Sequence, residues 1–178
     1  MSNILTIGDT GFLGSYLVDR FKTQVWGYRF GELNDYAIPP SIDTVFYCAR
    51  VCRKEPPRRD RETVLLETKG MVKILSTFSK SKIIYCSSKV VDGWGKEWER
   101  PVSREKIGDY FEKTLSGSFS NQIVHLPEIS GPQLRKFPPR EALSEDQIHY
   151  ARSKLIGETL VKSCAKDYTI FRIWDITQ

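Results

Sequence analysis

ILTIGDTGFLG, residues 4–14, is the stretch that decides the fold of this chain. Its first four residues are apolar or β-branched and stop at Gly8, a pattern that predicts a short buried strand. A helix is predicted after the glycines, because apolar side chains then recur at helical spacing: Phe12, Leu13, Tyr16, Leu17 and Phe21. A strand, a glycine-rich turn and a helix N-terminus therefore follow one another without a gap.

The glycines of this stretch have the spacing GxxGxxG, which suits a tight strand-to-helix turn. Gly8 permits the turn, Gly11 lets the backbone approach a pyrophosphate, and Gly14 lets the helix pack against the strand. The free N–H groups of the first helical turn would then face the phosphates. The alternative is a turn that needs glycine for structural reasons alone. We predict a dinucleotide site here, with three further cofactor-binding residues: Thr10, Phe12 and Leu13.

The rest of the chain alternates short apolar runs with amphipathic stretches. Strands are predicted at 24–28, 44–49, 82–86, 122–126 and 169–174, and helices at 61–79 and 103–115. A last helix should begin at Ser144, which forms a capping-box pattern with Gln147, and continue to about Lys166. The segments 31–41, 51–61 and 131–140 are predicted to be loops or connectors. This alternation predicts an α/β fold: a single-domain, Rossmann-type doubly wound parallel sheet that binds ligands at the carboxyl ends of its strands.

Composition excludes several other classes of protein. The 178 residues are 40% hydrophobic, enough for a buried core, and no apolar run reaches the roughly 18 residues of a membrane helix. No secretory signal is evident at the start, and the four cysteines form no CxxC pair, so we expect a reduced, cytoplasmic protein. Two histidines make a histidine-based metal site unexpected. The net charge of +5 suits an anionic small molecule better than nucleic acid.

Several segments then resemble, in order, the extended short-chain dehydrogenase/reductase family of NAD(P)-dependent nucleotide-sugar epimerases, dehydratases and reductases. Residues 44–49, TVFYCA, are similar to the strand whose end lies over the cofactor in that family, which implies cofactor contacts from Cys48, Ala49 and Arg50. Residues 68–71 resemble its fourth helix, with Glu67 where the family usually has Asn. Residues 85–93, YCSSKVVDG, resemble its catalytic Ser/Thr strand, and the VVDG ending is closest to the dTDP-4-dehydrorhamnose reductase branch.

The helix predicted over 144–166 resembles the YxxxK helix of the family, through Tyr150 and Lys154 with Glu158 beyond. Residues four apart share one helix face. A phenol is a poor acid or base at neutral pH, and a neighbouring ammonium stabilises its ionised form. The resemblance implies that a serine hydroxyl holds the substrate carbonyl while Tyr150 exchanges a proton, and that Lys154 also contacts the nicotinamide ribose. Both Ser87 and Ser88 qualify, and the spacing does not decide between them.

The choice of nicotinamide cofactor rests on the second predicted strand. It ends Trp26-Gly27-Tyr28-Arg29, without the acidic residue that binds the ribose in NAD enzymes. Arg29 could bind a 2′-phosphate instead, or be an ordinary solvated side chain. We therefore expect NADP in preference to NAD, and by resemblance we place Asp35 near the adenine.

Two features depart from the family pattern. Tyr150 follows Ser88 at a far longer interval than usual, and residues 95–145 are either an atypical insertion or a worn repeat of the 150–178 unit. In the repeat, Val102 would stand where the active tyrosine belongs, and a valine transfers no proton. The sequence also stops where the family's C-terminal substrate region would begin, so one NAD(P)-binding domain over 1–178, lacking most of that region, is expected.

Three functions remain open at this point. The first is an NAD(P)-dependent epimerase or reductase of a nucleotide-sugar substrate, and the second is a catalytically degenerate, cofactor-binding pseudoenzyme or regulatory subunit of the same fold. The third, a basic nucleic-acid-binding module, is disfavoured because the basic segment 50–61 has no interleaved aromatic residues for base stacking. The resemblance also implies a homodimer.

Overall fold

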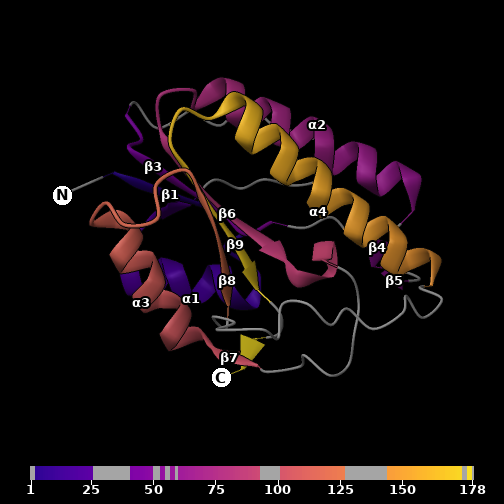
Figure 1. The fold of residues 1–178 in the computed structure, drawn as a ribbon, viewed down its shortest axis with the longest axis horizontal. Helices are drawn as coiled ribbons and strands as arrows, with labels where there is room; N and C mark the ends of the chain where they lie inside the picture. The colour runs from indigo at the N-terminus through magenta and orange to yellow at the C-terminus, as the bar shows by residue number, and fades with distance from the viewer. Residues whose placement is uncertain are drawn as a thin grey trace.

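Six parallel strands form the central sheet of the computed structural model, which describes residues 3–25, 41–49, 53–54, 57–58, 60–92, 101–126, 144–173 and 176–177. Within these ranges the strand order is β2-β1-β3-β6-β9-β8. The strands are β1 (Ile4–Ile7), β2 (Gln24–Val25), β3 (Thr44–Tyr47), β6 (Lys82–Ser88), β8 (Gln122–Leu126) and β9 (Tyr168–Ile173). The order runs outward in opposite directions from β1 and β3, so the fold is the predicted α/β, Rossmann-type doubly wound sheet (Figure 1). Its switch point lies between β1 and β3, where such sheets bind ligands.

Helices cover both faces of the sheet, as Figure 1 shows. The first face carries α1 (Phe12–Phe21) and α3 (Arg104–Leu115), and the second carries α2 (Arg61–Thr77) and α4 (Glu145–Cys164). Side chains alternate along β6 as a pleated strand requires. Ile84 and Cys86 pack in the core under α1 and α3, whereas Ile83 and Tyr85 pack in the core under α2 and α4. Strand β6 is therefore buried on both sides.

Helix starts follow the capping signals of the sequence. Asp60 accepts the Thr63 backbone N–H, and Ser144 forms the predicted capping box with Gln147. Helix α4 ends at Cys164, two residues before the predicted limit. By contrast, α1 has Gly11 at its N-cap position, with no side-chain cap and no acidic residue in its first turn. The first backbone N–H groups of α1 are therefore not capped by the side chain of the N-cap residue, as they are in α2 and α4.

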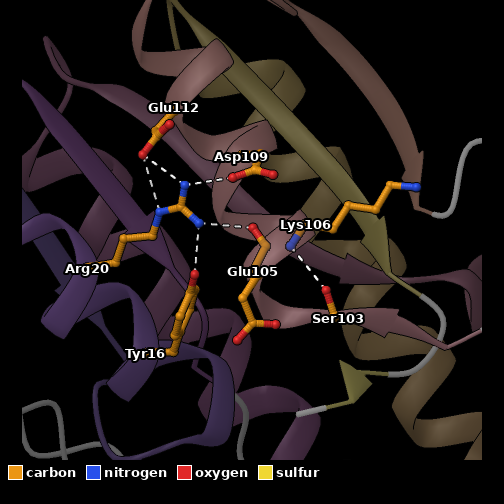
Figure 2. Close-up of polar contacts among 7 residues, drawn as sticks. All are labelled: Tyr16, Arg20, Ser103, Glu105, Lys106, Asp109 and Glu112. Carbon is orange, nitrogen blue, oxygen red and sulfur yellow. Dashed lines mark hydrogen bonds and ion pairs between the residues drawn. The ribbon is translucent and has the colours of Figure 1, made fainter.

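Arg20 joins the two helices on the first face (Figure 2). Its guanidinium donates to the carboxylates of Glu112 and Asp109 on α3 and to the Tyr16 hydroxyl on α1. These hydrogen bonds, that of Glu112 foremost, raise the pKa of Arg20 above its ordinary value. A Cβ at Gly108 would lie 2.3 Å from the guanidinium, so the glycine leaves the space that the arginine occupies.

The long interval between β6 and α4 contains a complete helix and strand. Residues 104–115 form α3 and residues 122–126 form β8, which lies at the sheet edge outside β9. Strand β9, which follows α4, is consequently the direct neighbour of β6, with Ser88 paired with Ile173 in register. A separate pair of two-residue strands, β7 (Val102–Ser103) and β10 (Ile176–Thr177), brings the start of this unit next to the end of the chain.

Several predicted boundaries need correction. Strand β6 continues to Ser88 instead of ending at Cys86, and is followed by a 3₁₀ turn, η1 (Lys89–Asp92). The segment predicted as a plain loop over 51–61 contains a short antiparallel pair, β4 (Arg53–Lys54) and β5 (Pro57–Arg58). Proline and the residue before it favour extended backbone, which suits a short pairing of this kind. Among the residues that the structure describes, no helix is long and apolar enough to cross a membrane.

Candidate functional site

The turn between β1 and α1 is built on the glycines that the sequence singled out. Gly8 has a φ of +90°, a conformation that L side chains rarely adopt, and the Gly11 N–H donates to its carbonyl. A Cβ at Gly8 would lie 2.6 Å from the Ala49 nitrogen, and one at Gly14 would lie 2.0 Å from the Gly8 carbonyl oxygen. Both clashes are with backbone, so neither position accepts a side chain without moving the turn. The helix packs directly on the strand end, as predicted.

The end of β3 forms the other side of this turn. The Cys48 N–H donates to the Ile7 carbonyl, which holds the two strand ends together just before Gly8. Ala49 is buried against the glycine, while Phe12, the first residue of α1, is exposed. Thr10 is exposed in the turn, and Leu13 is buried beneath it. The predicted residues of the glycine turn and the β3 end thus lie together at the switch point of the sheet.

Lys154 extends from α4 into the carboxyl end of the sheet. Its ammonium donates to the Cys86 carbonyl at 3.2 Å and lies 3.8 Å from Oε1 of Glu67 on α2. The side chains of Lys154 and Glu67 are 4% and 5% exposed. The ammonium also lies 5.9 Å from the centre of the Tyr150 ring, one helical turn earlier. The predicted tyrosine–lysine pair therefore shares one face of α4, with the charge buried beside the aromatic ring.

The two candidate serines differ in their hydrogen bonds. The Ser87 hydroxyl donates to Oε1 of Glu158 at 2.7 Å, and Arg172 donates to both oxygens of the same carboxylate. Ser87 is thereby tied to a buried ionic cluster between β6, α4 and β9. The Ser88 hydroxyl instead accepts a 3.4 Å bond from the Val90 N–H. That bond uses an oxygen lone pair and leaves the hydroxyl proton for another acceptor.

The buried groups next to the lysine are held in their neutral forms. Burial, followed by the charge of Glu67, raises the pKa of the Tyr85 phenol well above its ordinary value. A hydrogen bond with the Cys86 thiol, followed by burial, raises the pKa of Cys48, and the charge of Lys154 opposes this. Neither group is therefore ionised near neutral pH.

Three predicted residues, Arg29, Asp35 and Arg50, lie outside the described residues. Other residues of the region were not predicted to be functional. Glu67 was noticed only as a departure from the family pattern, and Cys86 was expected to be an ordinary strand residue.

The guanidinium of Arg104, on α3, lies 5.5 Å from the Phe12 ring and 5.3 Å from the Tyr16 ring, which places a cation beside the first turn of α1. No local sequence pattern predicts this contact, because Arg104 is far from the turn along the chain.

Comparison with known proteins supports the fold. No protein-family model matches the sequence, and no curated protein sequence matches it significantly. Among solved structures, the reductase domain of the aureusimine biosynthetic cluster superimposes with a TM-score of 0.54 at 14% identity, over 97% of this chain and 48% of that one. The UDP-N-acetylglucosamine 4-epimerase of Methanobrevibacter ruminantium M1, solved with UDP-N-acetylmuramic acid, has a TM-score of 0.52 at 15% identity, over 96% of this chain and 54% of that one.

A third similar structure contains a nicotinamide cofactor. RMD from Pseudomonas aeruginosa, solved in complex with NADPH, has a TM-score of 0.50 at 17% identity, over 97% of this chain and 54% of that one. The chain thus spans about half the length of each of these three proteins. At this level of identity the likeness shows a shared fold, found in a reductase domain, in an epimerase and in a protein solved with NADPH.

Proposed function

We propose that this chain is an NAD(P)-dependent epimerase or reductase that acts on a nucleotide-sugar by hydride transfer. The observation that carries the proposal is the position of Lys154, which is buried beside Tyr150 and donates a hydrogen bond to the end of β6. The glycine turn also lies at the carboxyl ends of the strands. A glycine turn alone would support cofactor binding only. The buried lysine beside a tyrosine adds a means of moving a proton.

The residues of the turn fit a dinucleotide. The space that a Cβ at Gly8 or Gly14 would fill is taken up by backbone, which keeps the turn narrow, and α1 has no side-chain cap of its own. Backbone N–H groups of this turn would bind the pyrophosphate. The nicotinamide, when bound, would supply the hydride chemistry.

The proposal gives each catalytic residue a definite role. Ser88 holds the substrate carbonyl oxygen, because Ser87 is already bonded to Glu158. Tyr150 gives or takes the proton at that oxygen. Lys154 stabilises the ionised phenol electrostatically and contacts the ribose.

We further propose NADP as the preferred cofactor. Arg29 is one candidate for the 2′-phosphate, and Arg104, which lies against Phe12 at the start of α1, is a second. A guanidinium can donate two hydrogen bonds to a phosphate. Replacing Arg104 with Met should weaken NADPH binding more than NADH binding if this arginine contributes.

The unit α3–β8 is proposed to be an insertion into an otherwise regular fold. Its strand lies outside β9 at the edge, so α4 and β9 remain next to β6, where an acid/base helix is useful. Tyr150 then needs no equivalent at Val102.

We also propose a homodimer formed through α2 and α4, because their outer faces carry half-exposed apolar side chains: Leu65, Val72 and Leu155.

One observation favours the alternative, a cofactor-binding pseudoenzyme or regulatory subunit of the same fold. The Glu67 carboxylate neutralises part of the charge that Lys154 would offer to an ionised Tyr150. A buried ion pair of this kind weakens the stabilisation that the ammonium gives to a third group. Under this alternative the protein binds NADPH and turns nothing over.

The deciding experiment measures binding and turnover separately. Fluorescence titration with NADPH and NADH tests the glycine turn, and a panel of UDP- and dTDP-sugars, followed by nicotinamide absorbance and product analysis, tests catalysis. Tyr150→Phe should abolish turnover and leave cofactor affinity unchanged, whereas Ser87→Ala, the matched control for Ser88→Ala, should retain turnover. Failure to bind either nucleotide in a folded sample would overturn both candidate functions. Binding without turnover, and turnover gained by Glu67→Asn, would establish the degenerate form.

A further inference from the structure

Two cysteine thiols face each other across neighbouring strands at the carboxyl end of the sheet. Cys48 directly follows β3 and Cys86 lies in β6, one position beyond the paired residues Tyr47 and Tyr85. Their sulfur atoms are 3.3 Å apart, and both thiols are free. Neighbouring parallel strands lie about 4.8 Å apart, within the range of Cα separations that a disulfide spans. The two strands are therefore close enough for a disulfide, and bond formation needs only a small shift of the strand ends.

The pair is directly connected to both halves of the proposed active site. The backbone that follows Cys48 packs against Gly8 with no spare room, and the carbonyl of Cys86 accepts the hydrogen bond of Lys154. A covalent bond between the sulfurs would thus join the end of β3 to the strand that holds the lysine. Closing the gap to a bond length moves the sulfurs by about 1.2 Å, which the tight contact at Gly8 must absorb.

We propose that Cys48 and Cys86 form a redox-active dithiol that a peroxide converts reversibly into a disulfide. One cysteine thiol gives up its proton as its sulfur attacks a peroxide oxygen and the O–O bond breaks. The departing hydroxide takes that proton, so the step gives a sulfenic acid and releases water. The sulfur of the second cysteine then attacks the sulfenic sulfur and releases a second water. Two thiols lose two electrons and two protons, and hydrogen peroxide is reduced to two waters.

Proximity is what favours this outcome over simple oxidation of a single cysteine. A thiol 3.3 Å away traps a sulfenic acid before further oxidation, because the second step is intramolecular. The half-buried Cys48 is the more accessible of the two, since Cys86 is 7% exposed. The hydrogen bond with Cys86, followed by burial, raises the pKa of Cys48 and so lowers the thiolate fraction, which slows its reaction with peroxide.

The functional consequence rests on the proposed function. Because the disulfide displaces the end of β3 against the glycine turn, the oxidised protein should bind NADPH about tenfold more weakly, a coupling of the usual size between linked sites. Reduction should restore the affinity. The dithiol would then be a redox-controlled inhibitory site.

The test uses the full chain with Cys52→Ser and Cys164→Ser, so that only the pair remains. After hydrogen peroxide, intact mass should fall by two hydrogen atoms, both thiols should vanish together in maleimide labelling, and dithiothreitol should reverse both changes. The matched controls add Cys86→Ser or Cys48→Ser, and should form a dimedone-reactive sulfenic acid without a disulfide. Circular dichroism before and after oxidation verifies that the protein stays folded.

Three results would count against the proposal. Thiols that survive a peroxide dose sufficient to oxidise Cys164 in the unmodified protein would overturn the dithiol site, as would loss of the two thiols at independent rates. A disulfide that leaves NADPH affinity unchanged would overturn the inhibitory role. If neither redox form binds NADPH, the proposed function fails, while mass and labelling still decide whether the dithiol site exists.

Discussion

The ionic cluster around Glu158 allows a quantitative test of how the sheet and α4 are held together. The Glu158 side chain is 1% exposed and is paired with Arg172 of β9, which is 14% exposed, at 2.7 Å. Arg172→Met removes both of the donated hydrogen bonds and leaves a carboxylate buried, with Lys162 at 4.0 Å as a more distant cation. Breaking one partner of a buried pair costs about 3–5 kcal/mol. Glu158→Gln should cost less, because the remaining guanidinium can reach water.

Such a loss is large compared with the whole stability of a domain, about 5–15 kcal/mol. For a chain of this length each kcal/mol lowers Tm by about 2–4 °C, so Arg172→Met should lower Tm by about 6–20 °C. Urea unfolding followed by circular dichroism gives the free energy directly, provided that the m-value is unchanged. The double variant Glu158→Gln/Arg172→Met should be more stable than Arg172→Met, since it contains no unpaired buried charge.

The matched control is Ser87→Ala, which removes one hydrogen bond to the same carboxylate and should cost about 1 kcal/mol. The reasoning would be refuted by an Arg172→Met variant that loses less than about 1 kcal/mol, since a buried carboxylate that has lost its short guanidinium bonds should destabilise the protein by more than that. Strict additivity of the two single changes in the double variant would refute it too, because residues in direct contact should be coupled.

Three other outcomes are expected. Tyr85→Phe should raise the free energy of unfolding by about 1 kcal/mol, because within the described residues the buried Tyr85 hydroxyl has no hydrogen-bond partner. Burial raises the pKa of Tyr85 in the folded state, so the parent protein should lose stability as the pH rises above about 10, the ordinary pKa of a phenol. Urea midpoints should therefore fall less above that pH in the variant than in the parent. Gly157→Ala, whose Cβ would lie 2.3 Å from that hydroxyl, should lower Tm and do so less in the Tyr85→Phe background. Gly14→Ala should abolish NADPH binding in a fluorescence titration, and retained affinity would contradict the tight-turn geometry. Leu155→Lys should shift sedimentation from dimer to monomer, an outcome that a monomeric parent protein would rule out.

Local pattern was sufficient wherever the chain's own neighbours decide the conformation. The strand 4–7, the glycine turn and the helix that follows agree with the sequence, because periodicity and the φ > 0 requirement at Gly8 act within a few residues. The capping box at Ser144 is similar: both partners lie in the same turn. Strand ends were less well predicted, since β6 continues through two serines whose polarity resembles a turn but whose hydrogen bonds come from other elements.

The alternation of strands and helices and the glycine turn can be predicted from local patterns, since both depend on contacts close along the chain. The three-dimensional fold was needed to show which serine hydroxyl is bonded to Glu158, that Glu67 faces Lys154, and that Cys48 meets Cys86. It was also needed to show that β8 lies at the edge of the sheet, outside β9. The physical reason is the same in each case: these pairings join residues tens of positions apart, and the strand order that brings them together follows from burying both faces of the sheet.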